Sequence, residues 1–201
     1  MTQVLATLPG RSAEEAVRTA ERLGAVAGFV VGPELLAGPG PALVSGLGRF
    51  GPVLALAGLQ GPAGVAGAAA RRFADYGAHW VSVMAIDGPE TVQAVAGSGV
   101  IAVGVTLRRG QGDAEIASLR LGGSRGRTVS RLAEVAVEAG AGGILCDLPD
   151  LGVVAQVAPE AERFAWIDGV EEAGQAARRG AAYVIVEAGA AEAVLAALAL
   201  G

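Results

Sequence analysis

The sequence predicts a single (β/α)8 barrel, and three observations support this prediction. Short apolar runs rich in β-branched residues recur along the 201 residues, segments with helical periodicity separate them, and no linker or change of composition divides the chain. Uninterrupted apolar runs are typical of parallel strands that are buried on both faces, and their alternation with helices is typical of parallel α/β folds. We therefore treat residues 1–201 as one domain.

Eight runs have the character of buried strands. They are VLATL (4–8), GFVVG (28–32), VLALAGL (53–59), WVSVMAI (80–86), VIAVGVTL (100–107), GILCDL (143–148), FAWID (164–168) and YVIVE (183–187). Eight strand–helix pairs are what a closed (β/α)8 barrel requires. A doubly wound open sheet is the alternative, and the lack of a GxGxxG turn after the first strand disfavours it.

The segments between these runs carry helix start and stop signals. Ser12 and Glu15 form a capping-box pattern, and Gly24 ends that helix. Thr128 is the expected N-cap of another helix, which ends at Gly140. Comparable helical patterns occupy PETVQAVAGSG, VEEAGQAARRG and the C-terminal EAGAAEAVLAALALG.

Residues 51–70 contain no charged side chain, and such a length would suffice to span a membrane. Gln60, Gly61 and Pro62 interrupt the run, however, and its two halves fit a strand and the helix that follows it. The first residues lack the basic region of a signal peptide. We therefore expect a soluble, cytoplasmic protein that has no membrane partner.

Composition excludes several classes of function. The net charge of −5 argues against non-specific nucleic-acid binding. All fifteen basic residues are arginine, so neither a lysine Schiff base nor a P-loop is available. Cys146 is the only cysteine, which excludes an intramolecular disulfide and fits a reducing compartment.

Four acidic residues follow the strands at the end of the barrel where such folds carry their chemistry. These candidate catalytic residues are Asp87, Asp147, Asp168 and Glu187. Clustered carboxylates can act as general acids and bases, because mutual repulsion raises at least one pKa. The alternative for Asp87 and Asp168 is helix N-capping. Carboxylates alone can also bind a divalent cation, but without a suitable histidine or spacing motif we expect no metal, and we expect no cofactor.

Arg108 follows the fifth strand and could hold a substrate carboxylate in a bidentate pair. Alternatively, it is simply an exposed residue of the glycine-rich segment 108–128. That segment could fold over the barrel mouth as a lid or form a mobile loop.

Several segments resemble those of the orotidine 5′-phosphate decarboxylase family, both in their order and in their amino-acid sequence. This family belongs to the ribulose-phosphate-binding barrels. The segments include SAEEAVRTAERLG, VGPELLAGPGPALVSGLGRFGPVLAL, GAHWVSVMAIDGPETVQA and AEVAVEAGAGGILCDLPD. The resemblance covers nearly the whole chain, and hexulose-phosphate synthases and ketogulonate-phosphate decarboxylases are more distant candidates. It implies a (β/α)8 barrel and a homodimer with active sites at the interface.

The resemblance also implies that the catalytic motif of the family is missing. The family's Asp-x-Lys-x-x-Asp signature, anchored on the following Pro and Val, falls on Ala55, Ala57 and Gln60. The strand-two lysine of the family falls on Val30, and the strand-four histidine falls on Met84. Neither orotidylate decarboxylation nor the reactions of the metal-dependent relatives are expected from these residues.

The phosphate-binding residues of the family are replaced as well. The Val-Gly-Arg of strand eight reads Val186, Glu187 and Ala188. A glutamate at this site would repel a phosphate dianion. The strand-one aspartate of the family, which goes with the missing catalytic motif rather than with the phosphate site, falls near Thr7. Arg108 aligns with a family serine that contacts the base.

These observations predict an enzyme of changed specificity: a lyase, decarboxylase, cyclase or isomerase that acts by acid–base chemistry. Its substrate would be a small or medium-sized, non-phosphorylated and partly apolar molecule, as in specialised metabolism. The expected substrate-binding residues are Gln60, Met84, Arg108, Val30 and Ala57. The alternative is a non-catalytic relative that binds a ligand or a partner protein. A pocket on which the four acids and Arg108 converge would favour the enzyme, and a plugged mouth would favour the scaffold.

Overall fold

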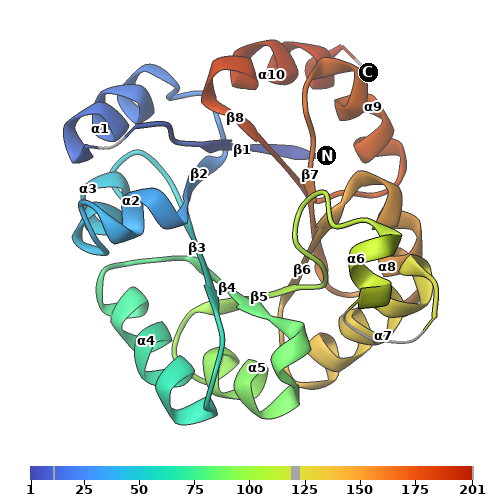
Figure 1. The fold of residues 1–201 in the computed structure, drawn as a ribbon. Helices are drawn as coiled ribbons and strands as arrows, with labels where there is room; N and C mark the ends of the chain where they lie inside the picture. Colours follow the sequence, from blue (N-terminus) through green and yellow to red (C-terminus); the bar gives the residue numbers. More distant parts are fainter. Residues whose placement is uncertain (11, 119–122, 201) are drawn as a thin grey trace.

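The strands of the protein close into a barrel. The computed structural model describes residues 1–10, 12–118 and 123–200. Within this part of the chain, eight parallel strands are hydrogen-bonded in the order β1-β2-β3-β4-β5-β6-β7-β8, and β8 pairs with β1 (Figure 1). The prediction of a (β/α)8 barrel is confirmed.

Each strand overlaps one of the predicted apolar runs. The strands are β1 Gln3–Thr7, β2 Gly28–Val31, β3 Val53–Leu59, β4 Trp80–Met84, β5 Ile101–Val105, β6 Gly143–Asp147, β7 Glu162–Trp166 and β8 Tyr183–Glu187. The fourth strand is shorter than predicted, because a 3-10 turn over Ala85–Asp87 begins directly after it.

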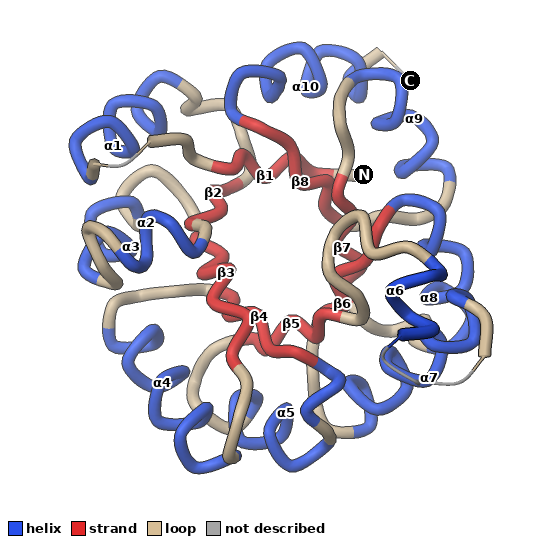
Figure 2. The backbone as a smooth tube through the Cα atoms, viewed as in Figure 1, coloured by secondary structure: helices blue, strands red, loops and turns tan. Residues whose placement is uncertain are grey.

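Helices surround the strands as an outer ring (Figure 2). They are α1 Ala13–Arg22, α2 Pro33–Ala37, α3 Ala42–Leu47, α4 Ala63–Asp75, α5 Pro89–Ala96, α6 Asp113–Ser118, α7 Arg125–Glu138, α8 Leu151–Val157, α9 Val170–Arg178 and α10 Ala191–Ala199. Further 3-10 turns cover Leu148–Asp150 and Ala188–Ala190. Residues 51–70, the uncharged stretch, form β3 and the first part of α4, as predicted. In the described part of the chain, no helix has both the length and the apolar character needed to cross a membrane.

The N-caps of two helices test the predicted start signals. The Ser12 hydroxyl accepts a hydrogen bond from the Glu15 amide at 3.2 Å, as the capping-box pattern predicts. The prediction of Thr128 as the cap of α7 is wrong. Ser124 is the N-cap and accepts from the Arg127 amide at 3.5 Å, whereas the Thr128 hydroxyl donates to the Ser124 carbonyl inside the first turn. Ser124 lies one turn before Thr128, so its hydroxyl is next to the amides of the first helical turn, which have no carbonyl partner within the helix.

The core has two layers because successive side chains of each strand point to opposite sides. Inside the barrel, Leu5, Val30 and Leu54 pack with other inward-facing residues. The second layer lies between the strands and the helices and includes Ala55. A strand surrounded on both faces in this way shows an apolar run rather than alternation.

An aromatic cluster closes the N-terminal end of the barrel interior. Trp80, Phe164 and Tyr183 contact one another, with ring centroids 5.6 Å apart for Trp80 and Phe164 and 4.7 Å apart for Phe164 and Tyr183. The Trp80 indole N–H donates to Glu162 Oε2 at 3.1 Å, which satisfies the only polar group of that ring. Burial, with Glu162 nearby, raises the pKa of Tyr183.

Candidate functional site

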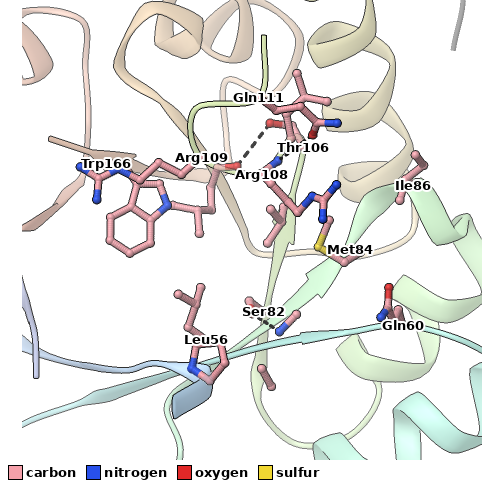
Figure 3. A pocket seen from close by; sticks show the side chains of 16 residues that line it. Leu56, Gln60, Ser82, Met84, Ile86, Thr106, Arg108, Arg109, Gln111 and Trp166 are labelled. Carbon is pink, nitrogen blue, oxygen red and sulfur yellow. Dashed lines mark hydrogen bonds between the residues drawn. The ribbon is translucent and has the colours of Figure 1, made fainter. Parts of the chain in front are cut away.

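The mouth of the barrel holds a cavity of about 540 Å³ at the C-terminal ends of β3 to β7 (Figure 3). Its apolar lining consists of Pro33, Leu56, Ala57, Met84, Ile86, Val105, Leu107, Leu145 and Trp166. Its polar lining consists of Gln60, Ser82, Thr106, Arg108, Arg109 and Gln111. No carboxylate of the described residues belongs to this lining. The mouth is therefore hollow rather than plugged, and its charged groups are cationic.

A β-turn after β5 carries both arginines of the lining. The Gln111 amide donates to the Arg108 carbonyl at 3.1 Å, and the Gln111 side-chain oxygen Oε1 accepts from the Arg108 amide at 3.3 Å. Gly110 occupies the third position of this turn with a φ of 73°, a conformation that favours glycine. The turn is thus closed by bonds between its own first and last residues.

Arg125, the first residue of α7, clamps this turn to β6. Its guanidinium donates to the Gln111 carbonyl, and Nη2 donates to Asp147 Oδ2 at 2.8 Å and to Asp150 Oδ2 at 2.6 Å. Asp147 also accepts from the Gly110 amide at 3.2 Å. Hydrogen bonding to Asp150 raises the pKa of Arg125. The turn is therefore held at two backbone groups, the Gly110 N–H and the Gln111 C=O.

Sequence reasoning did not identify Arg125, although one signal was present. A cation in the first turn of a helix is unfavourable against the helix dipole, so an arginine there needs an acidic partner. Its partners Asp147 and Asp150 are supplied by the end of β6 and the turn after it, far away along the chain.

Arg109 separates the large cavity from a smaller one. Its guanidinium lies over the Trp166 ring at 5.0 Å from the centroid and forms an ion pair with Asp168. The smaller cavity has a volume of about 200 Å³, and its lining includes Arg109, Trp166, Asp147, Asp168 and Glu172 of α9. The two cavities thus share Arg109 and Trp166.

The structure distributes the four predicted catalytic acids around the mouth. Asp147 and Asp168 border the smaller cavity, each in an ion pair with an arginine. Asp87 accepts from the Gly61 amide at the junction of β3 and α4. Glu187 is exposed at the end of β8, in register with Thr7 of β1. The four carboxylates do not meet in the large cavity.

The capping interpretation of Asp87 and Asp168 is wrong. Gly88 is the N-cap of α5 and Gly169 is the N-cap of α9, and neither helix has a side-chain cap. Each aspartate lies one residue before the cap position and is engaged elsewhere, Asp87 by the Gly61 amide and Asp168 by an arginine.

Four of the five predicted substrate-binding residues line the large cavity. These are Ala57, Gln60, Met84 and Arg108. Val30, the fifth, is fully buried inside the barrel and does not belong to the lining. Sequence reasoning missed Ser82 and Gln111, because a serine within an apolar strand and a glutamine in a glycine-rich loop give no distinctive signal.

Ser82 stabilises the irregular end of β3. Its buried hydroxyl accepts a hydrogen bond from the Gly58 amide at 2.7 Å. Gly58 has a φ of 52°, and the pairing of β3 with β4 shifts register between Ala55 and Leu59. The shift allows Leu56, Ala57 and Gly58 all to border the cavity.

The remaining groups with reactive potential do not form a site. Cys146 is buried, and burial raises the pKa of its thiol, which disfavours the nucleophilic thiolate. Within residues 1–10, 12–118 and 123–200, no group of three or more His, Cys, Asp or Glu side chains is placed to hold a metal ion. Of the segment predicted as a lid or mobile loop, 108–118 forms the turn and α6, and residues 119–122 lie outside the described residues.

Comparisons of the sequence with known proteins give partial matches. No protein-family model matches the chain. It is 39% identical over 128 residues to the orotidine 5′-phosphate decarboxylase of Anaeromyxobacter dehalogenans, a match that covers 62% of this chain and 56% of that protein. It is 38% identical, with the same coverage, to the enzyme of Anaeromyxobacter sp. strain K. The chain thus matches little more than half the length of these curated relatives.

Solved structures match over nearly the whole chain. An orotidine 5′-phosphate decarboxylase from Lactobacillus acidophilus has a TM-score of 0.87 at 16% identity and covers 100% of this chain and 97% of its own. The enzyme from Pyrococcus horikoshii has a TM-score of 0.84 at 20% identity, and the match covers 98% of this chain and 99% of that one. An uncharacterised conserved protein from Geobacillus kaustophilus has a TM-score of 0.85 at 20% identity, and the match covers 98% of this chain and 97% of that one. At these identities the matches establish the fold.

Proposed function

Because the chain is an orotidine 5′-phosphate decarboxylase-like barrel with a different set of residues at its mouth, we propose that it binds a small, partly apolar carboxylate there. One observation carries the proposal: among the described residues, the cavity has apolar walls, no carboxylate in its lining, and an arginine whose guanidinium has no partner. Among the described residues, the Arg108 guanidinium forms neither a hydrogen bond nor an ion pair. A guanidinium beside an apolar cavity binds a planar carboxylate through two parallel hydrogen bonds.

The ligand is proposed to be non-phosphorylated and different from orotidylate. Ala57 and Gln60 border the cavity where the resemblance expects a lysine and an aspartate. At the end of β8, Glu187 places a negative charge beside the position of the expected phosphate arginine. We therefore expect no decarboxylation when the protein is incubated with orotidylate. Robust turnover in that assay would contradict this part of the proposal.

A binding experiment tests the proposed role of Arg108. Titration calorimetry with 3-phenylpropionate and its neutral amide, 3-phenylpropionamide, separates the charge from the apolar ring. Loss of a charge-assisted hydrogen-bonded pair in Arg108→Gln should weaken binding of the acid roughly tenfold to a hundredfold. Binding of the amide should change little.

Arg71→Gln is the matched control for Arg108→Gln. Arg71 is exposed on α4, outside both cavities. Its substitution should leave both dissociation constants unchanged. Equal binding of acid and amide to the wild type, or equal effects of the two substitutions, would contradict the proposal.

Acid–base catalysis on the bound ligand is a second candidate function, and one observation supports it. Asp147 and Asp168 border the smaller cavity, which shares Arg109 and Trp166 with the large one. A ligand that extends past Trp166 would meet these carboxylates, as a lyase or isomerase reaction requires. Turnover of a bound carboxylate that falls at least tenfold in Asp168→Asn at unchanged Kd would support an enzyme. Binding without chemical change would support the non-catalytic alternative.

The homodimer belongs to the same proposal and rests on the resemblance alone. Light scattering coupled to size-exclusion chromatography measures the mass directly. A mass twice that of the 19.8 kDa chain is expected.

A further inference from the structure

Gln111 is the most completely engaged residue of the cavity lining. It is 7% exposed, and its backbone N–H, its backbone C=O and its side-chain oxygen each have a partner. The partners are the Arg108 carbonyl, the Arg125 guanidinium and the Arg108 amide. Only the side-chain nitrogen Nε2 remains, with its two N–H donors.

The orientation of this carboxamide is set by its hydrogen bonds. The side-chain oxygen must face the Arg108 amide, since that group can only donate, and Nε2 therefore faces away from the turn. In the part of the chain that the structure describes, Nε2 makes no hydrogen bond. Thr7 Oγ1 is the one fully covered side-chain nitrogen or oxygen atom of the described residues that lacks a hydrogen-bond partner, so Nε2 keeps an open side. The open space that Gln111 borders is the large cavity.

The turn therefore presents to the cavity two donor groups that have no partner among the described residues: the Arg108 guanidinium at its first residue and the Gln111 N–H groups at its last. Both lie on the same side of the cavity, across from Leu56 and Ser82 (Figure 3). A ligand that covers these donors without supplying acceptors removes their hydrogen bonds to water, so a ligand that supplies the acceptors is favoured over one that does not. Donors fixed in one short turn select acceptors that lie close together in the ligand.

We propose that Gln111 is a specificity-determining residue, which selects carboxylates that carry a carbonyl oxygen on the adjacent carbon. The ligand class is that of 2-oxo acids with an apolar side chain. Arg108 would bind the carboxylate, Gln111 the 2-oxo oxygen, and the apolar walls the side chain. The inference rests on the proposed function, because it assumes that Arg108 binds a carboxylate in the large cavity.

Arg125 acts here as a positioning residue. Its bond to the Gln111 carbonyl and its pairs with Asp147 and Asp150 hold the last residue of the turn in place. The donor on Gln111 thus needs no reorganisation when a ligand enters, which favours affinity.

A matched pair of acids tests the proposal on the wild-type protein. Phenylpyruvate and 3-phenylpropionate differ only by a carbonyl in place of the methylene next to the carboxylate. One additional hydrogen bond should make phenylpyruvate bind roughly fivefold tighter in titration calorimetry. In Gln111→Met, which keeps the length of the side chain but has no donor, this ratio should fall to about one. Gln111→Glu, which presents a carboxylate oxygen instead, should reverse the preference.

The outcomes separate this inference from the proposed function. If neither acid binds, or if binding does not depend on Arg108, the proposed function fails and the inference fails with it. If both acids bind through Arg108 but with equal affinity, or if the ratio survives in Gln111→Met, only the inference about Gln111 is overturned. Because the wild-type ratio needs no variant, the test stands even if a Gln111 variant fails to fold.

Discussion

The two ends of the barrel interior are built from the same strands but filled in different ways. At the N-terminal end, Trp80, Phe164 and Tyr183 pack ring against ring and close the interior. At the C-terminal end, Met84 and Trp166, which lie later on β4 and β7, border a cavity instead. One closed ring of strands, seen in Figure 2, surrounds the whole interior.

This difference separates stability from binding. Large rings that fill the interior gain dispersion contacts and remove apolar surface from water. Side chains that border a cavity forgo part of that gain and leave room for a ligand. Substitutions at the closed end should therefore change the free energy of unfolding, and substitutions at the open end should mainly change binding.

The largest effect is expected from Trp80→Ala at the closed end. Trp80 is 2% exposed, and its removal leaves a cavity and takes away the indole donor to Glu162, whose remaining partner is the Tyr183 hydroxyl at 3.4 Å. The free energy of unfolding should fall by about 3–5 kcal/mol, measured by denaturant titration. Trp166→Ala, at the open end, should cost clearly less because Trp166 is only half-buried. Equal losses would refute the division between the two ends.

Arg125→Met should have the next largest effect. It leaves Asp150, whose side chain is 5% exposed, and Asp147 without their cation. The free energy of unfolding should fall by about 2–4 kcal/mol. The comparison is Arg18→Met, which removes an exposed pair with Glu14 on α1 and should cost less than about 0.5 kcal/mol. A small effect at Arg125 would mean that the turn at the open end does not depend on this clamp.

Gly110→Ala should combine a modest loss of stability with weaker binding. The φ of 73° at Gly110 is strained for alanine by about 1–2 kcal/mol, although an added Cβ meets no atom within 4 Å. Relief of this strain would displace Arg108 and Gln111, so the Kd for 3-phenylpropionate should rise. Gly112→Ala is the control, since Gly112 lacks a left-handed φ and an added Cβ there also meets nothing. Identical results for both glycines would argue against the turn as the binding element.

The smallest effect concerns Cys146, which lies near the open end but faces the core. Burial raises the pKa of its thiol, so at pH 8 the folded protein should contain less thiolate than a free cysteine would. A disulfide reagent such as Ellman's reagent should label Cys146 only after unfolding. Rapid labelling of the folded protein would show that this part of the barrel opens readily.

The fold was predictable because buried parallel strands leave a direct mark on the sequence. The run VLALAGL predicted a strand over 53–59, and β3 spans Val53–Leu59. The N-cap of α7 was harder to predict. Thr128 and Ser124 can both cap a helix, and only the path of the backbone decides which of them does. The cytoplasmic location and the absence of a nucleic-acid partner stay predictions.

The candidate site was predictable only in part. Position along the strands predicted Arg108, Gln60 and Met84 at the mouth, and the three residues line the large cavity, whereas their role in binding stays a prediction. It did not show that Asp147 is paired with Arg125, because the partners lie 22 residues apart on different elements. Nor could it show that the Nε2 donors of Gln111 have no acceptor among the described residues, since that follows only from the hydrogen bonds of the whole turn.

From the sequence alone follow the barrel, the uncharged third strand and the lack of any lysine chemistry, because these depend on composition and on the period of apolar residues. Tertiary packing determined which arginines at the barrel mouth are neutralised by acids and which can still bind a ligand. The guanidinium groups of Arg125 and Arg109 are paired with acids, whereas the Arg108 guanidinium has no partner among the described residues. The physical reason is that ion pairs and cavities depend on distances of a few ångströms between side chains from different strands, which neighbours along the chain do not specify.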